Sequence, residues 1–186
     1  MRAEEFFRYS EQPCARLERA RKFLLSELPA PLTRASAHVQ LTDNYLTNTR
    51  LRLRFIRTPA TRERVWLLQQ KYAPADLSRT FVNEIHLSEY EYEVFSVFEG
   101  NEIRKNRYPF MHDGRTFEID VFLGPLWGLI LAKTRFATDE DLETFAMPAF
   151  AIKDVTNELA LTSAKLVDAT FVALIDKIAM FSERAK

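Results

Sequence analysis

Charged and apolar residues alternate strictly along several short stretches of the chain, and this alternation limits the folds open to it. In the segment 50–55, three arginines alternate with leucine and phenylalanine. Side chains on a β-strand point to opposite faces with period two, whereas a helix would spread the arginines around its axis. The segment is therefore predicted to be a strand with a cationic face and an apolar face.

The segment 117–136 shows the same division on two strands. Glu118 and Asp120 lie on one face of the first predicted strand, and Lys133 and Arg135 lie on one face of the second. A Gly-Pro pair and a further glycine between the strands suit a short connection. We expect a hairpin that is charged on one side and apolar on the other.

Similar alternation predicts the remaining strands. They are expected at 16–25, within 38–57, and at 65–72, 81–87 and 103–108. Capping boxes that begin at Ser88 and Thr138 predict two short helices. From about 163 to 183, apolar residues at helical spacing predict a terminal helix on the apolar outside of the sheet. Residues 1–15 are interpreted as an N-terminal extension and residues 16–186 as a single domain.

The composition limits the class of protein. The chain has 186 residues, of which 47% are hydrophobic, and this is enough for one well-filled core. The 26 basic and 26 acidic residues give no net charge that would indicate a nucleic-acid or membrane partner. Cys14 is the only cysteine, so no internal disulfide can form, and no apolar run has spanning length. A cytoplasmic protein is expected.

If all the charged faces belong to one interior, the strands close into a barrel with the charges in its lumen. A closed sheet of roughly eight strands has room for one small ligand, with helices over its apolar outside. Cations outnumber anions on these faces, so the ligand is expected to be an anionic small molecule rich in oxygen. The cations are Lys22, Arg50, Arg52, Arg54, Lys71, Lys105, Arg107, Lys133 and Arg135, and the anions are Glu18, Glu84, Glu118 and Asp120.

The order of these motifs resembles the CYTH domains, or triphosphate tunnel metalloenzymes. That family opens with Glu-x-Glu-x-Lys, where this chain has 18–22, and continues with Tyr-Leu before alternating arginines, here 45–54. A family Lys-x-Arg-Tyr is similar to 105–108, and the family hairpin is similar to 117–135. The resemblance covers about residues 16–168. It implies an α+β fold with an eight-stranded antiparallel β-barrel, in which basic residues hold a triphosphate and acidic residues bind Mg²⁺ or Mn²⁺.

The chain departs from the family on the acidic side of the site. Ala20 replaces the second glutamate of the opening motif, and Lys133 and Arg135 replace a Glu-x-Glu. Val82 stands where another acid is often found. At roughly 4 Å and an effective dielectric near 20, each like-charge pair costs about 4 kcal/mol. A Mg²⁺ or Mn²⁺ site is therefore expected to be weakened or absent, although the resemblance implies metal-binding roles for Glu18, Glu84, Glu118 and Asp120.

Three functions are open at this point. The favoured one is binding of a triphosphate-containing or other polyanionic phosphate compound, with degenerate catalysis. An alternative is a metal-dependent triphosphatase acting on inorganic triphosphate or a nucleoside triphosphate, with adenylate cyclase activity as a minor branch. A second alternative is a non-catalytic scaffold whose tunnel charges pair with one another. Metal-dependent phosphate release separates the first two functions, and absence of phosphate-ligand binding indicates the third.

Overall fold

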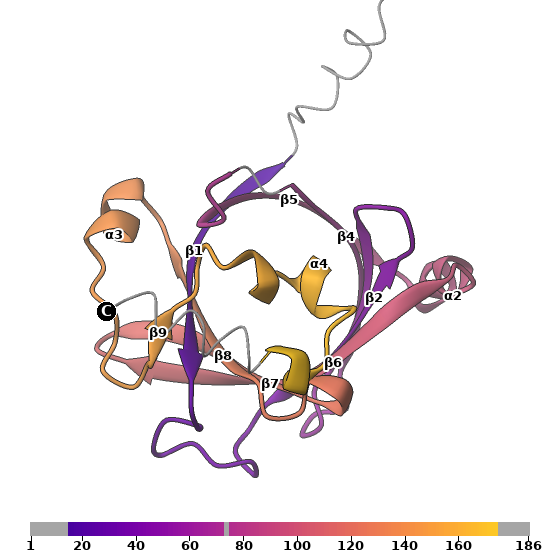
Figure 1. Cartoon of the computed structure of the whole chain (residues 1–186). Coiled ribbons are helices and arrows are strands. Elements are labelled where there is room, and N and C mark those ends of the chain that lie inside the picture. The colour runs from indigo at the N-terminus through magenta and orange to yellow at the C-terminus, as the bar shows by residue number, and fades with distance from the viewer. Residues whose placement is uncertain (1–14, 73–74, 175–186) are drawn as a thin grey trace, which may run out of the picture.

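Eight antiparallel strands form a closed barrel. The structure, a computed structural model, describes residues 15–72 and 75–174. The strands follow the order β5-β4-β3-β2-β6-β7-β8-β1, and an additional pairing of β5 with β1 closes the ring (Figure 1). Their bounds are β1 Arg16–Leu25, β2 Val39–Leu46, β3 Leu51–Arg57, β4 Arg64–Tyr72, β5 Arg79–Leu87, β6 Gly100–His112, β7 Arg115–Phe122 and β8 Ile130–Phe136. A short strand, β9 (Lys153–Asp154), pairs with β1.

The barrel confirms the fold predicted from charge alternation, and the strands differ from the predictions mainly at their ends. β3 begins at Leu51, so Arg50 lies in the preceding turn rather than on the strand. β6 extends to His112 because a tight turn follows it: Asp113 and Gly114 both have positive φ, at 48° and 71°. Such a pair suits a two-residue hairpin connection, which lets β6 and β7 stay paired up to the turn.

Two helices lie outside the ring of strands (Figure 1). The first is α2 (Glu89–Ser96), and its capping box between Ser88 and Glu91 is present as predicted. The second is α3 (Asp139–Thr144), capped by the side chain of Thr138. The segment that follows α3 covers the apolar outside of β1 and β6 to β8, where Phe145 and Phe150 pack on a cluster that includes Phe23, Phe117, Ile119 and Ala132.

The C-terminal segment does not lie on the outside of the sheet as predicted. It forms a 3-10 turn, η2 (Leu159–Leu161), and a short helix, α4 (Ser163–Leu166). Its apolar side chains Leu161, Leu166 and Leu174 pack against Leu24, Ile103, Phe122 and Leu131. Phe122 and Leu131 face the lumen, so this segment closes one end of the barrel (Figure 1). The segment after α3 already covers the outside of β1 and β6 to β8, and the apolar end of the lumen offered further apolar surface to bury. Residues 175–183 of the predicted helix lie outside the described residues, as do residues 1–14 of the predicted extension 1–15.

Truncating Leu166 is expected to destabilise the protein, because this side chain is 1% exposed among the residues that close the barrel. Leu166→Ala should lower the free energy of unfolding by about 2–5 kcal/mol. Leu159→Ala is a matched control, since Leu159 is on the same segment and 67% exposed. Urea denaturation followed by circular dichroism measures both. Equal stability of the two variants would show that the segment does not seal the lumen.

Within the described residues, no helix is long and apolar enough to cross a membrane.

Candidate functional site

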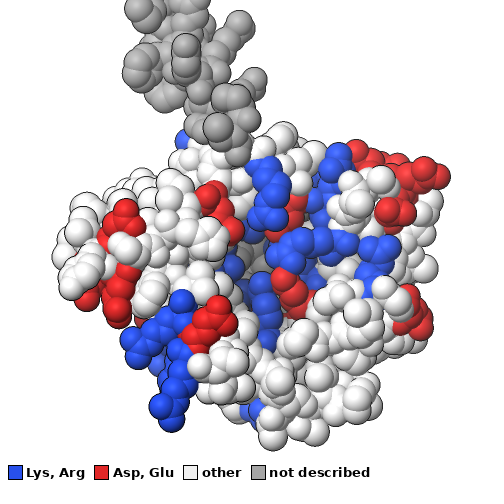
Figure 2. Space-filling view, turned by 180° about the vertical axis from the view of Figure 1, so that it is seen from behind, with Lys and Arg blue, Asp and Glu red and all other residues white. Residues whose placement is uncertain are grey.

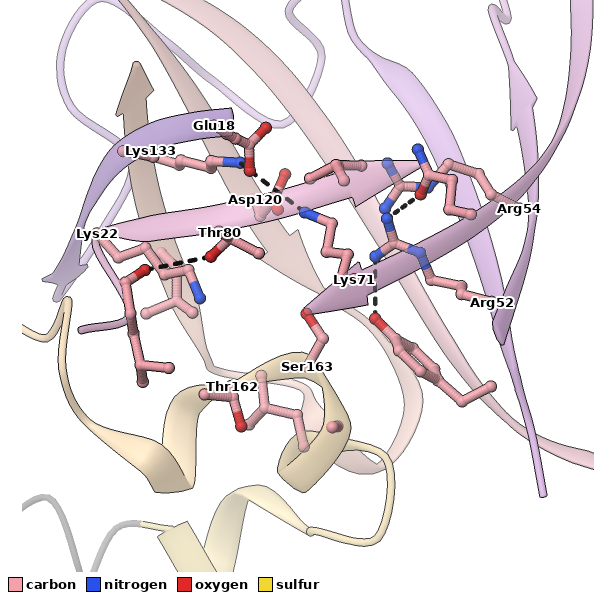
Figure 3. Close-up of a pocket in the computed structure, with 18 of the residues that line it drawn as sticks. Glu18, Lys22, Arg52, Arg54, Lys71, Thr80, Asp120, Lys133, Thr162 and Ser163 are labelled. Carbon is pink, nitrogen blue, oxygen red and sulfur yellow. Dashed lines mark hydrogen bonds and ion pairs between the residues drawn. The ribbon is translucent and has the colours of Figure 1, made fainter. Parts of the chain in front are cut away.

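The lumen contains a cavity of about 330 Å³. Residues of all eight barrel strands line it, and the closed end is lined by Leu161, Thr162, Ser163, Ala164 and Leu166. Figure 2, seen from the side opposite to Figure 1, shows basic side chains gathered around a hollow. Figure 3 shows charged side chains pointing into the cavity from the strands and the hydroxyl of Ser163 pointing toward it from the closing segment. The tunnel is therefore a charged pocket that is closed at one end, with the Ser163 hydroxyl at that end.

The structure brings the predicted site residues together. Every predicted cation lines the cavity, and so do the acids Glu18, Glu84 and Asp120. Glu118 is not among the residues that line the cavity, but it forms ion pairs with Arg107 and Arg135, which do line it. Glu84 is exposed, and within the described residues its hydrogen bond comes from Gln69 rather than from a cation.

Glu18 is the centre of one ionic cluster. Its Oε1 lies 2.6 Å from Lys133 Nζ and 3.3 Å from Lys71 Nζ, and its Oε2 lies 3.0 Å from Arg135 Nε (Figure 3). Burial raises the pKa of the Glu18 carboxyl, but the three cations outweigh it and hold that pKa well below its usual range. Burial lowers the pKa of Lys133 to about 7, although Glu18 favours the protonated amine.

Asp120 is the centre of a second cluster. Its carboxylate accepts hydrogen bonds from Lys105 Nζ at 2.6 Å and from Arg107 Nε and Nη2 at 2.6 and 2.8 Å. Burial lowers the pKa of Lys105 to about 8 against the attraction of Asp120. Arg107 Nη1 also lies 2.7 Å from Glu118 Oε2, and Arg135 bonds the other oxygen of Glu118. Arg135 thus links the cluster around Glu18 to the cluster around Asp120.

Asp43 is a site residue that the sequence analysis missed. It is 1% exposed, and it accepts hydrogen bonds from Arg54 Nε at 2.5 Å and Nη2 at 2.7 Å. Arg52 Nη1 lies 3.4 Å from the same carboxylate. No alternation of charges marks Asp43, because its neighbours 39–42 and 44–46 carry no charge. The signal that identifies it is the antiparallel register, which places Asp43 directly opposite Arg54 and therefore on the same face.

The lumen retains positive charge that these ion pairs do not neutralise. With Arg16 and Asp43 added to the predicted residues, ten cations face five carboxylates. Lys22 and Arg50 have no carboxylate partner within the described residues, and Arg50 lies over the ring of Tyr72, 4.2 Å from its centroid. The buried Nε of Arg52 has no hydrogen-bond partner within the same residues. An anion is the group that would satisfy these atoms.

The carboxylates of the lumen do not fit a divalent metal. In the described part of the chain, no three His, Cys, Asp or Glu side chains are grouped so that they could hold one. Both oxygens of Glu18 are occupied by cations, and Ala20 offers no ligand atom. Mg²⁺ binds through oxygen ligands and is repelled by fixed ammonium and guanidinium groups at this distance. The predicted weakening of the metal site stays a prediction, and this donor set supports it.

Comparison with known proteins identifies relatives, although no known family profile matches the chain. An inorganic triphosphatase of Nitrosomonas europaea is 28% identical, over 74% of this chain and 88% of the relative. The crystal structure of the inorganic triphosphatase NE1496 superposes with a TM-score of 0.54 at 24% identity, over 81% of this chain and 93% of the other. A second structure, of the hypothetical protein NE1496, has a TM-score of 0.55 at 22% identity, over 82% and 99%. These structural matches establish the fold.

A closed antiparallel barrel with a charged lumen defines a tunnel-type β-barrel protein. The curated relative and the matching barrel, together with the order of the sequence motifs, support this chain as a member of the triphosphate tunnel family.

Proposed function

We propose that the tunnel binds a triphosphate-bearing or similar polyphosphate anion, with degenerate catalysis. The observation that carries the proposal is the surplus of cations in an enclosed lumen, with Lys22 and Arg50 unpaired within the described residues. Guanidinium and ammonium groups are the side chains that hold phosphate oxygens in proteins. The similarity to an inorganic triphosphatase supports a triphosphate-related ligand.

We propose that hydrolysis is slow because of Lys133 and Arg135. These two residues supply fixed positive charge where the resemblance implies a metal, and they can neutralise phosphate oxygens directly. A fixed cation cannot orient an attacking water as a metal ion does, and phosphoryl transfer depends on that positioning. Binding is therefore expected to persist while hydrolysis is slow.

The two alternatives rest on other observations. The name of the curated relative supports a triphosphatase, which the resemblance implies to be metal-dependent. Glu18, Glu118 and Asp120 also stand at positions where the resemblance implies acids. Each of these acids, however, is paired with cations. Adenylate cyclase activity remains the minor branch of that alternative. The many ion pairs support a scaffold with a self-paired tunnel, but pairing leaves the surplus of cations described above.

Lys22 is the residue that tests the proposal. It pairs with no carboxylate of the described residues, so its removal leaves their ion pairs intact. Lys22→Met should weaken binding of tripolyphosphate by at least about tenfold, since a hydrogen bond to a charged group contributes about 1.5–3 kcal/mol. Lys165→Met is a matched control, because Lys165 is exposed and does not line the cavity. Titration calorimetry in excess chelator, with citrate as a non-phosphate anion, measures the affinities. Absence of tripolyphosphate binding to the wild-type protein, or equal binding by both variants, would refute the proposal.

Binding is also expected to weaken as the pH rises. A polyanion favours protonated lysines, so Lys133, with a pKa of about 7, and Lys105, with a pKa of about 8, take up protons when the ligand binds above these values. Affinity should fall steadily from about pH 6 to about pH 9, and the calorimetric heat should depend on the ionisation enthalpy of the buffer. Constant or rising affinity over this range would contradict the placement of the lysines. The charged groups facing these two amines are Glu18, Asp43, Arg54, Lys71, Arg107, Glu118, Asp120 and Arg135.

A further inference from the structure

Three cations from two strands converge on one carboxylate. Lys71 comes from β4, and Lys133 and Arg135 come from β8, while Glu18 lies on β1. Both carboxylate oxygens are used, with N···O distances of 3.3, 2.6 and 3.0 Å to the three cations in that order. Glu18 is buried, and its single negative charge faces three positive charges, of which Arg135 also pairs with Glu118. The cations thus form a preformed site for an oxyanion.

A phosphate group matches this cation site better than a carboxylate does. It offers more oxygen acceptors than a carboxylate and, within a polyphosphate chain, at least one negative charge, and charge-assisted hydrogen bonds to such oxygens are among the strongest in proteins. The site also adjoins the remaining lumen cations, which would receive the neighbouring phosphates of the same chain (Figure 3).

We propose that the Glu18 carboxylate occupies a phosphate subsite formed by Lys71, Lys133 and Arg135, and that a polyphosphate ligand binds by displacing it. This inference rests on the proposed function. Displacement needs only a change of side-chain rotamer, and Arg16, on the same face of β1 and exposed, offers a cation for the displaced carboxylate.

The internal carboxylate of Glu18 sets an affinity threshold that every ligand of the subsite must exceed. Every ligand must compete with this carboxylate. The apparent association constant is therefore the intrinsic constant multiplied by the fraction of protein in which the subsite is free. A single phosphate contacts only this subsite, so its contacts there must offset the whole free-energy cost of displacing Glu18. A polyphosphate also contacts Lys22 and Arg50, which within the described residues are not paired with a carboxylate. At concentrations where only these additional contacts offset the displacement, polyphosphates therefore bind and inorganic phosphate does not.

The test is Glu18→Gln, which removes the charge and keeps the shape. In excess chelator, we expect this variant to bind tripolyphosphate at least about tenfold more tightly than the wild-type protein, and to gain measurable binding of inorganic phosphate. Glu102→Gln is the matched control, because Glu102 is an exposed acid that pairs with a cation, Arg104, at 3.2 Å and does not line the cavity. It should bind both ligands much as the wild-type protein does.

Glu18→Gln leaves three cations facing one another, so a thermal-shift measurement accompanies the titration. Tripolyphosphate should raise the melting temperature of Glu18→Gln by more than that of the wild-type protein. Equal or weaker binding by Glu18→Gln, with normal binding by the wild-type protein, overturns the inference and leaves the proposed function intact. Binding by neither protein refutes the proposed function itself.

Discussion

Replacing Arg52 and Arg54 together by alanine is expected to weaken tripolyphosphate binding by at least about tenfold, and also to destabilise the protein by about 3–5 kcal/mol. The binding loss follows from two guanidinium groups that line the cavity. The stability loss follows from Asp43, whose buried carboxylate is bonded by both arginines. Their removal leaves this charge uncompensated in the interior. Considered alone, the arginines suggest that the fold tolerates the change, because it removes repulsion between like charges. Their pairing with Asp43 reverses that expectation.

Adding Asp43→Asn to the double variant separates the two effects. Because the substitution removes the uncompensated charge, it should recover most of the lost stability without recovering affinity. Chemical denaturation and calorimetry are both needed. A double variant as stable as the wild-type protein would contradict the role of Asp43, and unchanged affinity would place the ligand elsewhere.

Reversing the charges of Lys133 and Arg135 is expected to make both the stability of the protein and its tripolyphosphate binding dependent on a metal ion. In Lys133→Glu with Arg135→Glu, two new carboxylates join Glu18 and Glu118, which the original cations contact directly. Four neighbouring carboxylates repel one another, and each like-charge pair at roughly 4 Å costs about 4 kcal/mol at an effective dielectric near 20. Mg²⁺ or Mn²⁺ would relieve this repulsion through oxygen ligands.

The double reversal should therefore be unstable in chelator and gain a large increase in melting temperature from Mg²⁺ or Mn²⁺. Tripolyphosphate binding should then require the metal. Lys133→Gln with Arg135→Gln is the control, because it removes the cations without creating ligands, and it should lose affinity without gaining metal dependence. If metal changes neither stability nor binding of the charge-reversed protein, Lys133 and Arg135 do not stand at a cation position.

The sequence predicted the barrel and its basic lining because both depend on local periodicity. Alternation with period two places Arg52 with Arg54, and Lys133 with Arg135, on one face whatever the neighbouring strand is. The strand 16–25 was predicted with the bounds that β1 has. Which charges pair across the lumen depends on the register between strands, which a single segment does not contain.

Two features could not be obtained from periodicity. Asp43 sits beside residues that are common in turns, and only the pairing of β2 with β3 puts it opposite Arg54. An apolar stripe such as the one at Leu161 and Leu166 packs against any apolar surface, so its pattern does not distinguish the end of the lumen from the outside of the sheet. The bounds of the domain, the cytoplasmic location and the absence of a nucleic-acid partner stay predictions.

Metal independence of ligand binding is the central claim, and one titration tests it most directly. Tripolyphosphate is titrated into the wild-type protein in excess chelator, in Mg²⁺ and in Mn²⁺, with correction for ligand complexed by the metal, and the same samples are assayed for phosphate release. Our account predicts the same affinity in all three conditions and slow hydrolysis in each. Loss of binding in chelator, or fast phosphate release with Mg²⁺ or Mn²⁺, would contradict it and favour a metal-dependent triphosphatase.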